Sequence, residues 1–243
     1  METTGFEQLV TAVRASAERL GESVGALTDR EAREPSLLPG WSRGHVLTHV
    51  ARSADAYRWL LAVARTGTPP GPRADSAELE RQLREGAGRG ADALVADLRG
   101  SLDGLLADAA ALPAERRAVL VTALAGWRHP AWYLLWRAWR ELEVHHVDLN
   151  LGYSPKSWPD DFVRRALDES VAALAARRVA LARIGAEDLG RTWPLGEQGP
   201  VVRGPGHTLL AWLAGRAPAA DLRSDGPLPE LPRWPLPPVP GWG

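Results

Sequence analysis

The 243-residue sequence contains no cysteine. This absence excludes disulfide bonds, thiolate ligands to a metal and a cysteine nucleophile. Any thiol chemistry that this chain performs must therefore use a sulfur atom supplied by another molecule.

Long apolar runs and an excess of charge of one sign are also missing. No run of about 18 apolar residues could span a bilayer, and the opening METTGFEQLV lacks the basic-then-apolar order of a signal peptide. The 29 basic and 30 acidic residues give a formal net charge of −1, which provides no electrostatic footprint for nucleic acid. We therefore expect a cytoplasmic protein that binds neither nucleic acid nor a membrane.

Three further residue types are nearly absent. Lys156, Ile184 and Asn150 are each the only residue of their kind, whereas alanine, glycine, proline and arginine abound. This bias is typical of a GC-rich genome, and it makes a single arginine weak evidence of function. Because 45% of the residues are hydrophobic, the chain can bury a sizeable core, and its length fits one large domain or two modest ones.

Apolar residues at steps of three and four predict helices through the first part of the chain. The first helix is expected over residues 4–27, and the second begins after Ser42, a predicted N-cap. A third is expected from Ser76 to about residue 111. We place GAGRG, residues 86–90, inside this third helix rather than in a nucleotide-binding loop, because no strand precedes it.

The segment from His129-Pro130 to Gly152 predicts a fourth helix, since proline suits the first helical position. Four such helices with these connections make a four-helix bundle. A fifth helix is expected at about 159–183. Beyond it, RTWPLGEQGPVVRG alternates like two short strands, PGHTLLAWLAGR has the pattern of a helix, and the last segment is rich in proline.

These elements predict a mainly α protein with two domains. The first, residues 1–153, is a helical bundle. The second, residues 154–243, is a small α+β domain with a proline-rich tail.

Histidines and a carboxylate stand at helical spacing in two apolar segments. His45 and His49 are one turn apart in GHVLTHV, and Glu141 and His145 are one turn apart in WRELEVHHVDLNLG. Metal sites in bundles are built from inward-facing residues of different helices, so His49, Glu141 and His145 are candidate ligands. Three protein ligands leave one position open, as in catalytic sites. Taken alone, each histidine is more often a helix cap, a hydrogen-bonding group or a surface residue than a metal ligand.

Two of these segments resemble a known family. LPGWSRGHVLTHVARSADA and WRELEVHHVDLNLGY are similar to the mycothiol-dependent maleylpyruvate isomerase family, within the DinB-like metal-binding bundle superfamily, and GPGHTLLAWLAGR resembles the family's smaller second domain. The resemblance implies a DinB-like four-helix bundle in which His49, Glu141 and His145 bind a divalent metal. It also implies that His45 does not bind the metal and instead either contacts a ligand or belongs to the start of its helix. Zinc suits these ligands, as do nickel, cobalt and ferrous iron.

The resemblance further implies that the missing thiol is mycothiol, a low-molecular-weight thiol of GC-rich actinobacteria. A bound metal would lower the pKa of that thiol. The thiolate would then add to a cis double bond, allow rotation and leave again, which is cis–trans isomerisation. Transfer of the mycothiol sulfur onto an electrophile is an alternative, and a non-catalytic metal-binding protein is another. The expected partners are a small-molecule substrate and the thiol, with the chain a monomer or homodimer.

Three more residues are candidates for the site. Asp148, three residues after His145, could orient an imidazole. Arg216 matches the family's C-terminal arginine and would bind a substrate carboxylate bidentately, although an arginine that stabilises a helix C-terminus would look the same. Arg52, one turn beyond His49, is a weaker candidate for cofactor binding. His146 points away from this face, and we assign it no role.

Overall fold

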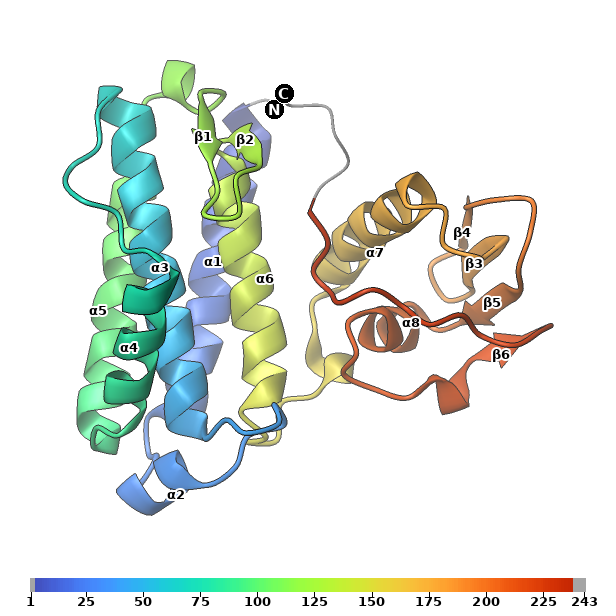
Figure 1. Ribbon diagram of the computed structural model, residues 1–243, viewed down its shortest axis with the longest axis horizontal. Helices are drawn as coiled ribbons and strands as arrows, with labels where there is room; N and C mark the ends of the chain where they lie inside the picture. The colour runs from blue at the N-terminus through green and yellow to red at the C-terminus, as the bar shows by residue number, and fades with distance from the viewer. Residues whose placement is uncertain (1–2, 238–243) are drawn as a thin grey trace. The chain divides into compact units, whose positions relative to one another are not determined.

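The structure is a computed structural model that describes residues 3–237, and the chain divides into two units after Gly152 (Figure 1). The first unit is helical apart from one short hairpin, and the second combines helices with a small sheet. The predicted class, a mainly α protein with a bundle followed by an α+β part, is confirmed. In residues 3–237, no helix is long and apolar enough to cross a membrane.

The long helices of the first unit form the bundle. They are α1 (Thr3–Val24), α3 (Arg43–Thr66), α5 (Ala91–Ala110) and α6 (Tyr133–Asp148). Helix α1 packs against α5 and α6, and α3 packs against the same two helices from the other side. The seam between α3 and α6 is therefore opposite the seam between α1 and α5. Apolar stripes line the centre, and Val13, Leu60, Leu105 and Trp136 are at most 2% exposed.

Shorter elements close the ends of the bundle. Helix α2 (Asp29–Arg33) and the turn Ala114–Arg116 connect longer helices, and α4 (Ser76–Ala87) packs along α3. The strands β1 (Leu120–Thr122) and β2 (Arg128–Pro130) pair in antiparallel register directly before α6. In Figure 1 this hairpin lies at the end of the bundle opposite α2.

The predicted boundaries of the first and the fourth helix are wrong. The first helix ends at Val24, because Thr28 starts the separate helix α2 with a capping box to Glu31. The fourth begins at Tyr133, because Pro130 is the last residue of β2, where a missing N–H is tolerated at the end of a ladder.

The predicted helix over residues 76–111 is in fact two helices. Gly88 ends α4, and Gly90 precedes α5. The first amide of α5, that of Ala91, donates to Asp29 Oδ1 at 2.7 Å. The segment GAGRG therefore spans the break between α4 and α5, and the Asp29 side chain of α2 caps the start of α5.

The second unit has two helices and a four-stranded sheet within its described residues. The helices are α7 (Asp160–Ala176) and α8 (Gly206–Leu213), with 3₁₀ turns at Pro155–Ser157 and Ala219–Asp221. The sheet has the order β4 (Arg191–Pro194), β3 (Arg183–Ala186), β5 (Val201–Gly204) and β6 (Arg223–Ser224). Only β3 and β5 are parallel.

Two predictions for this unit also need correction. The fifth helix ends at Ala176 instead of about residue 183, because Arg178 takes a left-handed conformation with φ 53° that a helix cannot continue. Residues 183–186 then form β3, so the sheet has more strands than the two that alternation indicated.

Candidate metal centre

The start of α3 is fixed by a capping box. The Ser42 hydroxyl accepts the amide N–H of His45, and His45 Nδ1 accepts the amide N–H of Ser42 at 3.2 Å. The ring of His45 is thereby engaged at the first turn. His49, one turn further along, is free to project from α3 toward α6.

A set of hydrogen bonds fastens this helix start to the end of α6. The amide of Leu37 donates to the carbonyl of Asp148 at 2.8 Å, and Arg43 Nε donates to the carbonyl of Leu149 at 2.8 Å. Arg43 is buried and also binds Glu34 Oε2 at 2.7 Å. These contacts fix the register of α3 on α6 and so set His49 opposite Glu141.

The side chains of His49, Glu141 and His145 converge on one point. Glu141 Oε2 lies 3.2 Å from His49 Nε2 and 3.2 Å from His145 Nε2. The two imidazole rings meet nearly at right angles, with centroids 4.7 Å apart. One ligand atom from each residue lies within 4.8 Å of the others.

Two further residues set the orientation of these groups. Tyr57 Oη donates to Glu141 Oε1 at 3.2 Å, which leaves Oε2 directed at the imidazoles. His145 Nδ1 donates to the buried carboxylate of Asp148 at 2.9 Å, which directs Nε2 at the centre as the nitrogen that a metal would bind after displacing its proton.

The electrostatics keep the carboxylate charged. Burial raises the pKa of Glu141, but hydrogen bonds from His145 and His49 outweigh it and hold that pKa well below its usual range. Burial lowers the pKa of His145, whereas hydrogen bonds to Asp148 and Glu141 raise it to about 9. Burial also raises the pKa of the Tyr57 phenol, which therefore stays protonated as a donor.

The donor set fits a divalent metal of the zinc type. Ligands about 2.0–2.1 Å from a tetrahedral zinc lie roughly 3.4 Å from one another, close to the 3.2 Å contacts made by Glu141 Oε2. The side chain of His49 is 34% exposed, against 18% for Glu141 and 13% for His145, so the group is reached from the His49 side. The group offers two imidazole nitrogens and one carboxylate oxygen, and it is accessible from one side. A metal held by these three ligands would keep one coordination position open.

The two predicted arginines have other partners. The Arg52 guanidinium binds Asp97 at 2.7 Å and Asp55 at 3.1 Å, and so bridges α3 and α5. Arg216 Nη1 donates to the carbonyl of Ala214 at 2.8 Å, at the end of α8. These contacts show structural roles, and ligand binding by either arginine remains a prediction.

The sequence reasoning missed Tyr57, Arg43 and a role for Trp41 beside the histidines. The Trp41 ring centroid lies 5.4 Å from that of His49. Tyr57 could have been found, because it follows His49 by eight residues, or about two helical turns on one face. His146, to which we assigned no role, lies 2.8 Å from Ser23 Oγ on α1.

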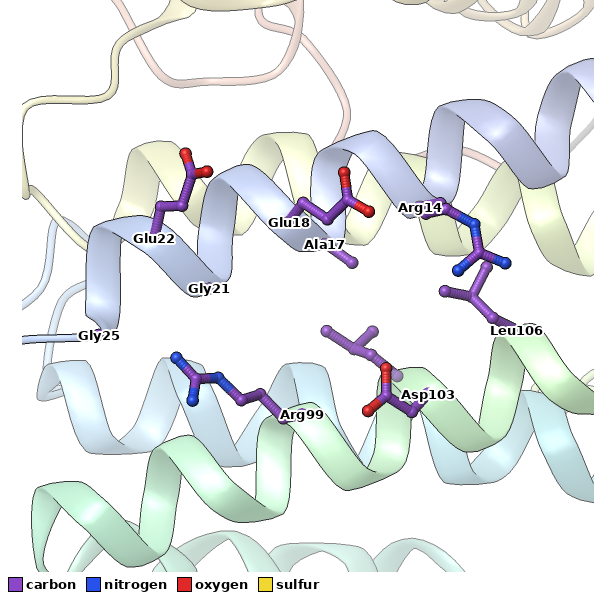
Figure 2. Close-up of a pocket in the computed structure, with 10 residues that line it drawn as sticks. Arg14, Ala17, Glu18, Gly21, Glu22, Gly25, Arg99, Asp103 and Leu106 are labelled. Carbon is purple, nitrogen blue, oxygen red and sulfur yellow. The ribbon is translucent and has the colours of Figure 1, made fainter.

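A separate groove of about 400 Å³ runs between α1 and α5 (Figure 2). Charged side chains of both signs line it, namely Arg14, Glu18, Glu22, Arg99 and Asp103. It follows the α1–α5 seam, on the opposite side of the bundle from the α3–α6 seam. The groove is therefore not part of the metal centre.

Comparison with known proteins gives a consistent result. Residues 13–150 match the family described as the mycothiol maleylpyruvate isomerase N-terminal domain. A crystal structure of the mycothiol-dependent maleylpyruvate isomerase is 26% identical and aligns over 96% of this chain and 100% of its own, with a TM-score of 0.85. A histidine-to-alanine mutant of that isomerase, 24% identical with the same TM-score of 0.85, supports the fold alone. None of the curated proteins matches the chain.

Proposed function

This chain belongs to the mycothiol maleylpyruvate isomerase family, and we propose that it is a metal-dependent enzyme that uses mycothiol to isomerise a cis double bond in a substrate of the maleylpyruvate type. The observation that carries this proposal is the convergence of His49, Glu141 and His145 on one point. The absence of cysteine agrees with it, because the nucleophilic sulfur must then come from an external thiol.

The chain's own residues prepare the centre for that chemistry. Asp148 keeps the proton of His145 on Nδ1, and Tyr57 occupies one oxygen of Glu141, so that Nε2 and Oε2 face the same point. A divalent metal bound there would lower the pKa of a thiol ligand and so supply a thiolate at neutral pH. The Trp41 ring lies beside His49, with ring centroids 5.4 Å apart.

Transfer of the thiol sulfur onto an electrophile is the second candidate function. It is favoured by the contact of Arg216 with its own helix end, because part of the proposed carboxylate-binding fork is used there. We retain Arg216 as the proposed substrate-binding residue for isomerisation, and transfer to an uncharged electrophile would not need it.

Product analysis separates these functions. Purified zinc-loaded protein is incubated with mycothiol and either maleylpyruvate or a panel of electrophiles, with His49→Ala as the control. A product of unchanged mass identifies an isomerase, and a product heavier by one thiol identifies a transferase. If neither product depends on both the thiol and His49, the proposal of a thiol-dependent enzyme is wrong, and the alternative of a non-catalytic metal-binding protein gains support.

A further inference from the structure

An arginine of α6 lies on the same face as the metal centre. Arg137 precedes Glu141 by four residues, one helical turn toward the hairpin. Its guanidinium carbon lies 4.7 Å from the centroid of the Tyr57 ring and 5.0 Å from that of Trp127. Because the hydroxyl of Tyr57 binds Glu141, a single side chain connects this guanidinium with the centre.

The position of Arg137 is fixed by a buried histidine. His129 Nδ1 donates to the carbonyl of Pro130 at 2.9 Å, so its Nε2 carries the lone pair and accepts from Arg137 Nη1 at 3.3 Å. Burial and the nearby arginines lower the pKa of His129 to about 4, in agreement with a neutral ring. Arg137 is thus held by two aromatic rings and one neutral acceptor, none of which cancels its charge.

A second guanidinium, that of Arg73, contacts the same β1–β2 hairpin. Arg73 comes from the loop after α3, stacks 5.3 Å from the Trp59 ring centroid and donates through Nη1 to the carbonyl of Thr122 at 2.8 Å. Burial and the charge of Arg137 lower its pKa. Arg137, at His129 and Trp127, and Arg73, at Thr122, therefore place two like charges against one short hairpin.

Neither arginine has a carboxylate partner among residues 3–237, whereas other arginines of the bundle, such as Arg52 and Arg58, form ion pairs. Stacking uses the faces of the two guanidinium groups and leaves most of their in-plane N–H donors for another acceptor. Neighbouring cations without an anion are unfavourable, and an anion that binds both would relieve the repulsion.

We propose that Arg137 and Arg73 form an anion subsite beside the metal centre that binds a carboxylate group of the substrate. The assignment rests on the proposed function, because it takes the substrate to react at that centre. A carboxylate suits the subsite because its two oxygens match the paired donors of a guanidinium fork. The proposal adds a carboxylate-binding subsite in the bundle to the contact proposed for Arg216.

Binding of a small cis-dicarboxylate tests the subsite without turnover. Maleate is titrated calorimetrically into the wild-type protein, zinc-loaded and metal-free, and its uncharged analogue maleamide serves as the matched ligand. The variants are Arg137→Gln and Arg73→Gln, and Arg99→Gln, an exposed arginine on the α1–α5 side, is the control. Circular dichroism establishes that each variant is folded, and Arg73→Gln, in a surface loop, keeps the test valid if Arg137→Gln does not fold.

We expect each subsite variant to weaken maleate binding at least about tenfold, because a charge-assisted hydrogen bond is lost. The control and the maleamide titration should not change, and metal-free wild-type protein should still bind maleate. Equal maleate affinity in all variants, no binding to the wild type, or binding that depends only on zinc would overturn the subsite. Arginine-dependent binding by a protein without thiol-dependent activity would instead uphold the subsite and refute the proposed function.

Discussion

Asp148 and Tyr57 each orient a proposed metal ligand without belonging to the proposed ligand set. Each makes one hydrogen bond to a proposed ligand, at 2.9 Å to His145 and 3.2 Å to Glu141. Such outer contacts fix the tautomer and the orientation of the ligand before the metal arrives. Without them the imidazole and the carboxylate would have to be ordered at a cost in binding free energy.

We expect Asp148→Asn and Tyr57→Phe each to weaken zinc binding by about 10–100-fold, the range typical of such outer partners. Competition with a chromophoric chelator measures the dissociation constant. Asp103→Asn, an exposed residue of α5, is the matched control and should bind zinc like the wild type. Unchanged affinity in both test variants would show that these hydrogen bonds do not support the centre.

The sequence indicated the candidate ligands, because histidines and a carboxylate stand at helical spacing in two segments. It also indicated the pair His145 and Asp148, because these residues are three positions apart in one predicted helix. It did not indicate Arg137 or Arg73. In a chain with 29 basic residues, nearly all of them arginine, no single arginine is distinctive. Their relation depends on Trp127 and Trp59, which lie far apart in the chain.

Two glycines allow helices α3 and α4 to pack closely. Gly86 is the first residue of GAGRG in α4, and Gly44 lies on α3 against the backbone of α4. A Cβ at Gly86 would lie 2.4 Å from Thr48 Cγ2, and a Cβ at Gly44 would lie 2.6 Å from the carbonyl oxygen of Ala87. Helices α3 and α4 therefore approach each other more closely than alanine would allow at either position.

We predict that Gly44→Ala lowers the free energy of unfolding by about 1–3 kcal/mol, since a backbone atom must move to admit the methyl group. Gly100→Ala, in α5 with nothing within 4 Å of the new methyl group, should instead raise it by about 0.5–1 kcal/mol. Urea denaturation followed by circular dichroism measures both. Equal effects of the two substitutions would mean that the α3–α4 contact is not tight.

Helices with long apolar stripes could be predicted, but their breaks could not. The stripe of the expected third helix continues across Gly88–Gly90, so periodicity alone gives no end there. The cap that allows the break comes from Asp29, 62 residues earlier. In the same way, β1 and β2 are too short to show alternation, and only their mutual pairing defines them.

For the whole molecule, buried neutral histidines make stability depend on pH. Burial is the main cause that lowers the pKa of both His129 and His146 to about 4, from an ordinary value of 6.5. Between these values the unfolded chain binds more protons than the folded one. The contribution of these two histidines to the free energy of unfolding is therefore largest above pH 6.5 and falls as the pH decreases toward 4.

We expect the contribution of His129 to this loss to be on the order of 2–3 kcal/mol across the window. Urea denaturation of wild type and His129→Gln between pH 7.5 and 4.5, in the presence of a chelator, isolates it as a difference in slope. The variant should lose less stability on acidification. Parallel curves for the two proteins would contradict a neutral buried His129.

The pairing of His49 with Glu141 also bears on the order of folding. These residues are 92 positions apart, and the bond between Leu37 and Asp148 closes a similarly long loop. We expect contacts of such long range to form late in folding, because closing a long loop costs entropy before its contacts are gained. Before that stage the chain offers only the local pair Glu141 and His145, which is too few ligands for tight binding. Metal uptake by the proposed centre would thus report completed folding of the bundle, and a chain arrested midway would stay unloaded even where zinc is plentiful.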